Sequence, residues 1–149
     1  LLESYQELQK NLPGDALLAS MIESNGIEMI LGMTTDQQLG PMITIGFGGY
    51  YAEALKDAVT LMPPFTAETA KTAIKSLRMK SLLDGYRGTD PVDINAFAQM
   101  ASVFSLIAIE FKEQISEIDI NPVILGKDNC IAVDALISLH QQKNKTEGE

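Results

Sequence analysis

Acidic and amide side chains alternate along residues 117–122, which read EIDINP. In an extended strand every second side chain points to the same side, so Glu117, Asp119 and Asn121 would share one face. Carboxylate and amide oxygens gathered in this way are ligands that Mg²⁺ accepts. The alternative is a solvated strand face that ends at Pro122.

A second apolar segment, residues 130–133, ends at Asp134. If the two segments pair as strands through the polar turn at residues 126–129, Asp134 approaches Asn121. An amide oxygen and a carboxylate, completed by phosphate oxygens and water, would form a magnesium site.

A glycine-rich stretch occupies residues 46–49 and is followed by Lys56. Glycines permit positive φ and leave backbone amides uncovered, so this loop could approach a phosphate or a partner loop. It has neither the Gly-Lys-Ser/Thr of a Walker loop nor Rossmann spacing. A simple turn, with Lys56 as an ordinary surface lysine, is the competing interpretation.

Arg87 stands between Gly85 and Gly88. An arginine on such a loop could grip a phosphate with two parallel hydrogen bonds. The competing interpretation is a salt bridge to Asp84 or Asp90.

The elements that would position these residues start with a helix over residues 1–12. Apolar runs at 16–22 and 27–35, separated by a turn, predict a hairpin. Further strands are expected over residues 42–47 and 53–59.

Helices follow the first strands. Thr66 and Asp93 are expected to cap two of them, the second running to about residue 112. Strands over residues 115–120 and 130–133 close the pattern, which predicts an α+β fold with a largely antiparallel sheet packed against helices.

The chain has 149 residues, 46% hydrophobic and 21% charged, with a net charge of −9. This composition predicts one domain over residues 1–149, with 141–149 as a disordered tail. The negative charge argues against nucleic acid as a partner, and no apolar run reaches the roughly 18 residues of a membrane span. Cys130 is the single cysteine, so it is expected to be a packed thiol in a cytoplasmic protein.

Residues 117–123 (EIDINPV) and 131–135 (IAVDA) resemble the metal-binding end of ATP-grasp domains in ADP-forming acyl-CoA synthetases. The β subunits of succinyl-CoA synthetase share the acidic-X-Asn-Pro pattern. The resemblance implies ATP and Mg²⁺ as cofactors, Asn121 and Asp134 as metal ligands, and Asp119 as the acidic residue beside them.

Three more segments carry the same resemblance, which covers roughly residues 16–137. Residues 26–34 (GIEMILGMT) match a family strand in which Glu28 would be the nucleotide-binding glutamate. The longest match is residues 40–57, which include Lys56, and a Gly-X-Arg-Gly loop includes Arg87. Lys56 and Arg87 are therefore possible phosphate contacts.

The adenine-binding stretch of the family corresponds to Ser20, Met21, Ile22 and Glu23. Ser20 stands where the family commonly has an acidic residue. Backbone groups of Met21 and Ile22 could still hydrogen-bond adenine, because that contact needs no particular side chain.

The resemblance implies the C-terminal lobe of an ATP-grasp domain. Its expected partners are a nucleotide, the N-terminal lobe and the CoA-binding and ligase domains, and on its own it is expected to be inactive. A homodimer is also possible on this interpretation. The alternative function is a non-catalytic regulatory or assembly module, such as the ATP-grasp-like part of a CoA-sensing protein acetyltransferase.

Overall fold

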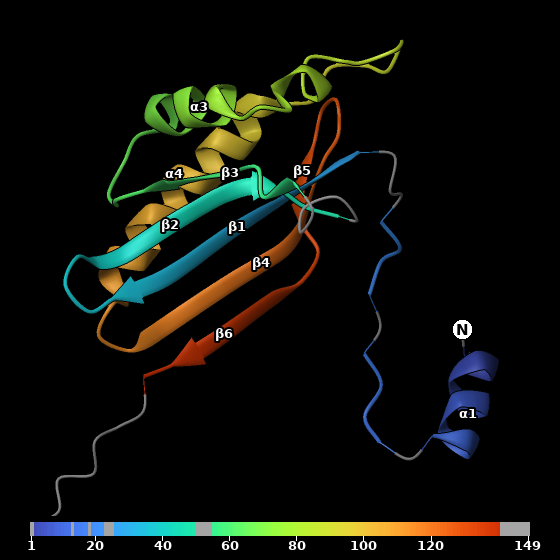
Figure 1. Cartoon of the computed structure of the whole chain (residues 1–149). Coiled ribbons are helices and arrows are strands. Elements are labelled where there is room, and N and C mark those ends of the chain that lie inside the picture. The colour runs from blue at the N-terminus through green and yellow to red at the C-terminus, as the bar shows by residue number, and fades with distance from the viewer. Residues whose placement is uncertain (1, 13, 18, 23–25, 50–54, 141–149) are drawn as a thin grey trace, which may run out of the picture.

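The computed structural model describes residues 2–12, 14–17, 19–22, 26–49 and 55–140 (Figure 1). Its centre is a six-stranded antiparallel sheet in the order β3-β2-β1-β4-β5, with β6 also paired to β4. The predicted α+β architecture is confirmed. The strands are β1 (Ile27–Asp36), β2 (Gly40–Phe47), β3 (Ala58–Leu61), β4 (Ile115–Leu125), β5 (Cys130–Ala132) and β6 (Ala135–Leu139).

The helices begin where the sequence supplies caps. The Thr66 hydroxyl accepts a hydrogen bond from the amide of Thr69, and the Asp93 carboxylate accepts one from the amide of Ala96, so both predicted N-caps are confirmed. The described helices are α1 (Leu2–Asn11), α3 (Ala67–Ser76), the 3₁₀ helix η1 (Lys80–Leu82) and α4 (Ile94–Glu110).

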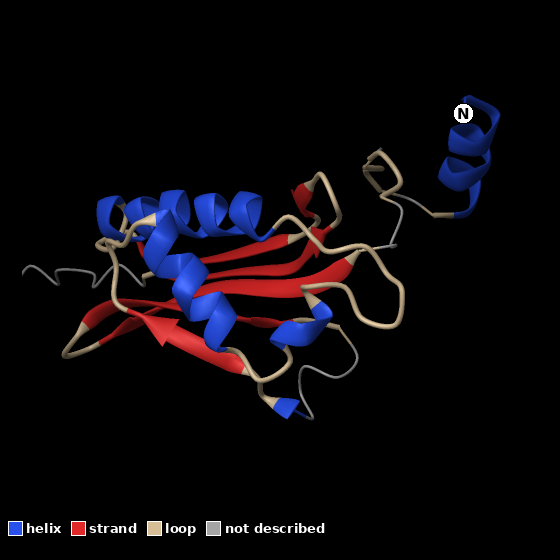
Figure 2. Cartoon of the chain, turned by 90° about the horizontal axis from the view of Figure 1, so that it is seen from above, coloured by secondary structure: helices blue, strands red, loops and turns tan. Residues whose placement is uncertain are grey.

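Helices α3 and α4 cover one face of the sheet (Figure 2). Alternate residues of β1, namely Met29, Leu31 and Met33, are fully buried beneath these helices. Phe97 and Ala101 of α4 are fully buried in the same hydrophobic cluster. The hydrophobic core therefore lies between the sheet and two helices.

No described helix covers the other side of the sheet, which we call the open face (Figure 1). Paired residues of neighbouring strands point to the same face of a sheet, so the strand register shows which residues lie on the open face. The open face carries Glu28, Gly32 and Thr34 of β1, Thr44 of β2, and Glu117 and Asp119 of β4.

The predicted strand at residues 16–22 is wrong. Its described residues, 16–17 and 19–22, have no regular structure, and none of them pairs with the sheet. Leu17 and Met21 are 95% and 93% exposed, so Met21 is not the core residue that its apolar type suggests. A strand needs a neighbour to satisfy its backbone groups, and the described part of the chain offers none at this segment.

Two other strand predictions need correction. The strand expected over 53–59 begins only at Ala58, and residues 53 and 54 lie outside the described part. The strand expected to end at Ile120 continues to Leu125, and the unpredicted β6 pairs beside it.

A buried carboxylate joins the start of β3 to the end of α3. The two oxygens of Asp57 accept hydrogen bonds from the amides of Arg78, at 3.0 Å, and Met79, at 2.8 Å. The Arg78 guanidinium lies 3.5 Å from Asp57 Oδ1. Burial alone raises the pKa of Asp57, but these hydrogen bonds and the arginine charge outweigh it, so the pKa lies below its ordinary value of 3.8.

We expect Asp57→Ala to lower the free energy of unfolding by roughly 1–3 kcal/mol at pH 7, because two amides lose their acceptor. The folded-state pKa of Asp57 is depressed, so its contribution is present above pH 3.8 and is lost as the pH falls through the folded value. Urea unfolding at pH 7 and at about pH 2 should therefore show a smaller deficit in acid. Asp84→Ala, at an exposed position, is the control. An equal deficit at both pH values would contradict the account.

Candidate functional site

A β-bulge interrupts β4 at the residues of greatest chemical interest. The register with β1 shifts between Met29 and Leu31, so Asn121 and Pro122 together lie opposite Ile30 alone. Bulges re-aim side chains and tolerate proline, since one residue is released from the ladder. The strand continues past Pro122, so the interpretation in which the strand ends at this proline is wrong.

The two predicted strand ends lie side by side. The amide of Asn121 donates a 3.2 Å hydrogen bond to the carbonyl of Asp134, and the amide of Val133 donates a 3.0 Å bond to that of Pro122. Both Asn121 and Asp134 are exposed. Asp119 lies two residues before Asn121 and pairs with Leu136 of β6. The structure therefore brings the backbones of the three predicted metal ligands to one place.

The donor set fits a magnesium–nucleotide complex better than a free metal ion. Asp134 Oδ1 accepts a 2.9 Å hydrogen bond from the amide of Ala135, so the carboxylate keeps lone pairs for a cation. Among the described residues, no group of three or more His, Cys, Asp or Glu side chains could hold a metal. One amide and one or two carboxylates would leave positions for phosphate oxygens and water, as Mg²⁺ commonly requires.

Glu28 lies on the open face at the same end of the sheet, opposite Ile124 of β4. Its backbone carbonyl accepts a 2.7 Å hydrogen bond from the amide of Gly48. At Gly49, with φ +72°, a β-carbon would lie only 2.7 Å from Glu28 Oε2. The glycine-rich loop therefore packs against the Glu28 side chain. The sequence alone did not predict this contact.

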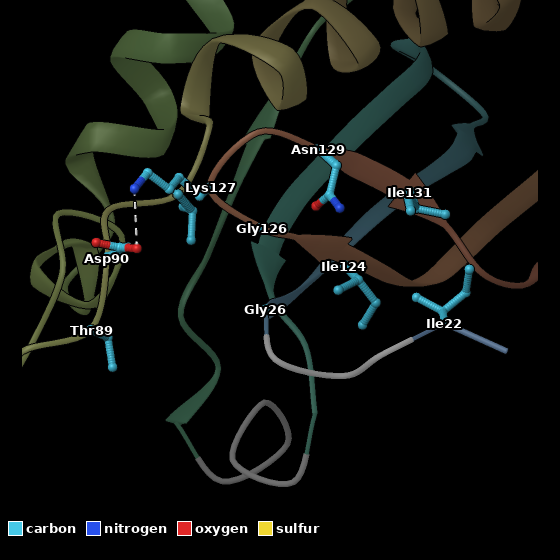
Figure 3. Close-up of a pocket in the computed structure, with 10 residues that line it drawn as sticks. Ile22, Gly26, Thr89, Asp90, Ile124, Gly126, Lys127, Asn129 and Ile131 are labelled. Atoms are coloured by element: carbon cyan, nitrogen blue, oxygen red, sulfur yellow. Dashed lines mark hydrogen bonds and ion pairs between the residues drawn. The ribbon is translucent and has the colours of Figure 1, made fainter.

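A pocket of about 450 Å³ opens beside this end of the sheet (Figure 3). Ile22, Ile124 and Ile131 form its apolar wall, and the 3.3 Å ion pair between Lys127 and Asp90 lies at another side. Ile124 and Ile131 were not predicted as site residues, because apolar strand residues look the same in a core and in a pocket wall.

The predicted adenine-binding stretch is only partly placed. Ser20 and Met21 are exposed, Ile22 is half-buried in the pocket wall, and Glu23 lies outside the described residues.

The two basic residues predicted to contact phosphate both have a positive backbone φ angle. Lys56 and Arg87 have φ values of +44° and +53°, which non-glycine residues adopt rarely. Lys56 directly precedes the buried Asp57. Among the described residues the ion pairs are Arg78–Asp57 and Lys127–Asp90, so the proposed salt bridge from Arg87 to an aspartate is wrong.

Arg87 instead lies over its neighbour Tyr86, with the guanidinium carbon 5.4 Å from the ring centroid. Among the described residues, no backbone hydrogen bond or ion pair joins the Arg87 loop to Asn121 or Asp134. The role of Arg87 as a phosphate contact therefore stays a prediction.

Cys130 of β5 packs against the core, with its sulfur 4.0 Å from that of Met100, as expected. Burial, and then the negative charge of Asp93, raise the pKa of this thiol to about 11. Because only the thiolate is a good nucleophile, we expect iodoacetamide at pH 8 to label the folded chain at least about 100-fold more slowly than the urea-unfolded chain. Equal labelling rates would contradict this assignment.

The sheet is antiparallel with helices on one face, and Asn121 at the bulge of β4 lies beside Asp134 between β5 and β6. This is the arrangement that the resemblance to ATP-grasp domains leads us to expect. A sequence model of the ATP-grasp domain family matches residues 2–139, and the chain belongs to this family.

Two similar curated proteins are subunits of ADP-forming ligases. The chain is 41% identical over 114 residues to the Pyrococcus furiosus acetate–CoA ligase [ADP-forming] I subunit beta, covering 76% of this chain and 49% of that protein. It is 36% identical over 125 residues to subunit beta of isoenzyme II, covering 83% and 52%. The chain therefore spans about half the length of these relatives.

Solved structures agree. PH1788 from Pyrococcus horikoshii is 31% identical, with a TM-score of 0.76 over 93% of this chain and 60% of that one. A Ca. Korarchaeum cryptofilum dinucleotide-forming acetyl-coenzyme A synthetase 1, in complex with coenzyme A and Mg-AMPPCP, is 32% identical, with a TM-score of 0.76 over 93% and 62%.

The described residues include no helix long and apolar enough to cross a membrane.

Proposed function

We propose that this chain is the magnesium- and ATP-binding lobe of an ADP-forming acyl-CoA synthetase, which converts a carboxylic acid, CoA and ATP into acyl-CoA, ADP and phosphate. The observation that carries the proposal is the hydrogen bond between the backbones of Asn121 and Asp134 at the end of the sheet. We place the enzyme in the cytoplasm, as its composition suggests.

The side chains suggest how a nucleotide would lie. The apolar wall of Ile22, Ile124 and Ile131 suits the flat face of a purine base. Glu28, opposite Ile124, could accept hydrogen bonds from the ribose hydroxyls. Asn121 and Asp134 would hold a magnesium ion that neutralises phosphate charge, and Lys56 or Arg87 would add positive charge.

Phosphoryl transfer requires charge stabilisation from several sides. The open face supplies one side, so we propose that the other ATP-grasp lobe and the CoA-binding and ligase domains supply the rest. By itself the 149-residue chain should release no detectable phosphate from ATP in the presence of acetate, CoA and magnesium.

The test of the function is a chimera in which this chain replaces the matching half of the P. furiosus subunit beta, assayed with the rest of that enzyme. Phosphate release that depends on acid and CoA supports the proposal. Robust turnover by the isolated chain, or tight magnesium–ATP binding without any turnover by the chimera, would contradict it.

One observation favours a regulatory or assembly module instead. Ser20 replaces the common acidic residue of the family, and it is exposed. A chimera that folds but binds no magnesium–ATP would support this second function, exemplified by the ATP-grasp-like part of a CoA-sensing protein acetyltransferase.

Gly49→Ala tests the role of Glu28. The new β-carbon would push the Glu28 carboxylate away, whereas the backbone at φ +72° costs only roughly 1–2 kcal/mol. We expect the chimera to lose nucleotide affinity roughly tenfold, as one charge-assisted hydrogen bond would. Gly40→Ala is the control, because its φ is +80° and its β-carbon would contact nothing within 4 Å. Equal effects of the two substitutions on affinity would exclude the role of Glu28.

A further inference from the structure

Strand β6 forms one edge of the sheet (Figure 1). It pairs with β4 on one side, and no strand in the described part of the chain pairs with its other side. Edge strands are commonly protected by proline or by charged side chains, because their free backbone groups would otherwise attract another strand. The five residues of β6, ALISL, include neither proline nor a charged residue.

The side of β6 that faces the helix layer is apolar. Ile137 pairs with the core residue Ile118, so the two side chains point to the same face of the sheet. Leu139 comes two residues later in the strand and points the same way. Both Ile137 and Leu139 are more than half exposed, so the helices leave this edge uncovered.

The end of helix α4 continues this apolar surface. Leu139 pairs with Ile115, whose amide donates a 2.9 Å hydrogen bond to the carbonyl of Phe111. The amide of His140 donates another 2.9 Å bond to the carbonyl of Gln114. These bonds bring the end of β6 to the end of α4, so exposed side chains of the two elements lie at one corner of the molecule.

We call five of these side chains the apolar patch. They are between 40% and 67% exposed, and they are Leu106, Ile107, Phe111, Ile137 and Leu139. The net charge of the chain is −9, yet neither residues 94–109 of α4 nor the residues of β6 include a charged side chain. Exposed apolar surface of this kind marks an interaction site.

We propose that two copies of this chain associate through β6 and the apolar patch. The two β6 strands pair antiparallel about a twofold axis, and the two patches then meet on the helix side of the joined sheets. A twofold axis suits this pairing, because each surface meets its own copy in the opposite direction. The open face stays free, so the inference does not rest on the proposed function.

The charges favour a second copy as the occupant. A chain with a net charge of −9 attracts basic proteins, but the patch itself offers no carboxylate to a partner's Lys or Arg. Burial of such a cation against apolar side chains would be unfavourable. A second copy instead presents an equally uncharged strand and patch.

The size of the patch predicts a weak dimer. A large apolar side chain offers about 60–120 Å² when it is fully exposed, so five half-exposed ones offer on the order of 250 Å² per copy. Even with the backbone of β6 added, this area lies below the roughly 800 Å² per partner of a standard interface. We therefore expect a dissociation constant of roughly 1–100 μM.

Sedimentation velocity of the 149-residue chain over about 1–300 μM tests the proposal, because a reversible dimer forms as the concentration passes its dissociation constant. Leu139→Lys should raise that constant at least about tenfold, since it would bury a charge in the patch. Leu106→Lys should do the same from α4. Leu136→Lys is the matched control, because Leu136 is 65% exposed on the same strand but pairs with Asp119 and so lies on the open face. It should keep the dimer.

A chain that stays monomeric over this range would overturn the proposal. Association that Leu8→Glu with Leu12→Glu abolishes, and that Leu139→Lys does not, would also overturn it, because the exposed apolar residues of α1 would then be responsible. Loss of the dimer in Leu136→Lys alone would assign the contact to the open face and would equally contradict the account.

Amide hydrogen exchange identifies the strand that pairs. At concentrations above the dissociation constant, the amides of β6 should exchange at least about tenfold more slowly than in the diluted chain, because a newly paired strand is protected. Exchange of β3, at the opposite edge of the sheet, should not depend on concentration. If the chimera with the P. furiosus half were monomeric and protected β6 at every concentration, the other half would be the occupant and the proposal would be wrong.

Discussion

Asp134→Asn is expected to weaken magnesium–ATP binding by the chimera at least about 100-fold. Loss of a residue that only supports a metal ligand usually lowers metal affinity by about 10- to 100-fold, and loss of a ligand itself should lower it more. The substitution removes the charge that would face the cation. It keeps an oxygen that can accept the 2.9 Å hydrogen bond from the amide of Ala135, so the local backbone should persist. Isothermal titration with AMPPCP, with and without magnesium, measures the effect.

The matched control is Asp128→Asn. Asp128 is exposed in the turn between β4 and β5, so the same charge is removed from the same hairpin. We expect the control to bind the nucleotide as the unchanged chimera does. If both variants lost affinity equally, general electrostatics and not a metal ligand would be responsible.

Phe97→Ala is expected to lower the free energy of unfolding of the 149-residue chain by roughly 3–5 kcal/mol, the usual cost of deleting a buried aromatic ring. Phe97 is fully buried in the layer between α4 and the sheet. Because small domains are stable by only about 5–15 kcal/mol, this is a large part of the total. Urea unfolding followed by circular dichroism measures it.

Val103→Ala on the same helix is the control, because Val103 is 59% exposed. We expect it to change stability by less than about 0.5 kcal/mol. Similar losses from both substitutions would mean that α4 does not pack as described.

The sequence predicted the parts of the fold that local chemistry decides. Thr66 and Asp93 predict where their helices begin, because a short side chain with an oxygen can accept hydrogen bonds from the first free amides of a helix. The strand at 27–35 follows from its apolar residues. The approach of Asn121 to Asp134 follows from a polar turn between two strands.

What the sequence missed depends on long-range pairing. Residues 16–22 have the composition of a strand, yet a strand forms only where a neighbour is available. Strand β6 depends on β4 beside it, and the bulge opposite Ile30 depends on register. The contact of Gly49 with Glu28 joins residues that are distant in the sequence.

The central claim is that Asn121 and Asp134 hold the metal of a magnesium–nucleotide complex, and Mn²⁺ can test it in the isolated chain even if binding is weak. Mn²⁺ prefers the same oxygen ligands as Mg²⁺ and broadens the NMR signals of nearby nuclei. With ATP and Mn²⁺ added in small steps, we predict that the amide signals of Asn121, Asp134 and Ala135 broaden first, well before that of Gln38 at the opposite end of β1. First broadening at Gln38, or uniform broadening over the whole chain, would contradict the account.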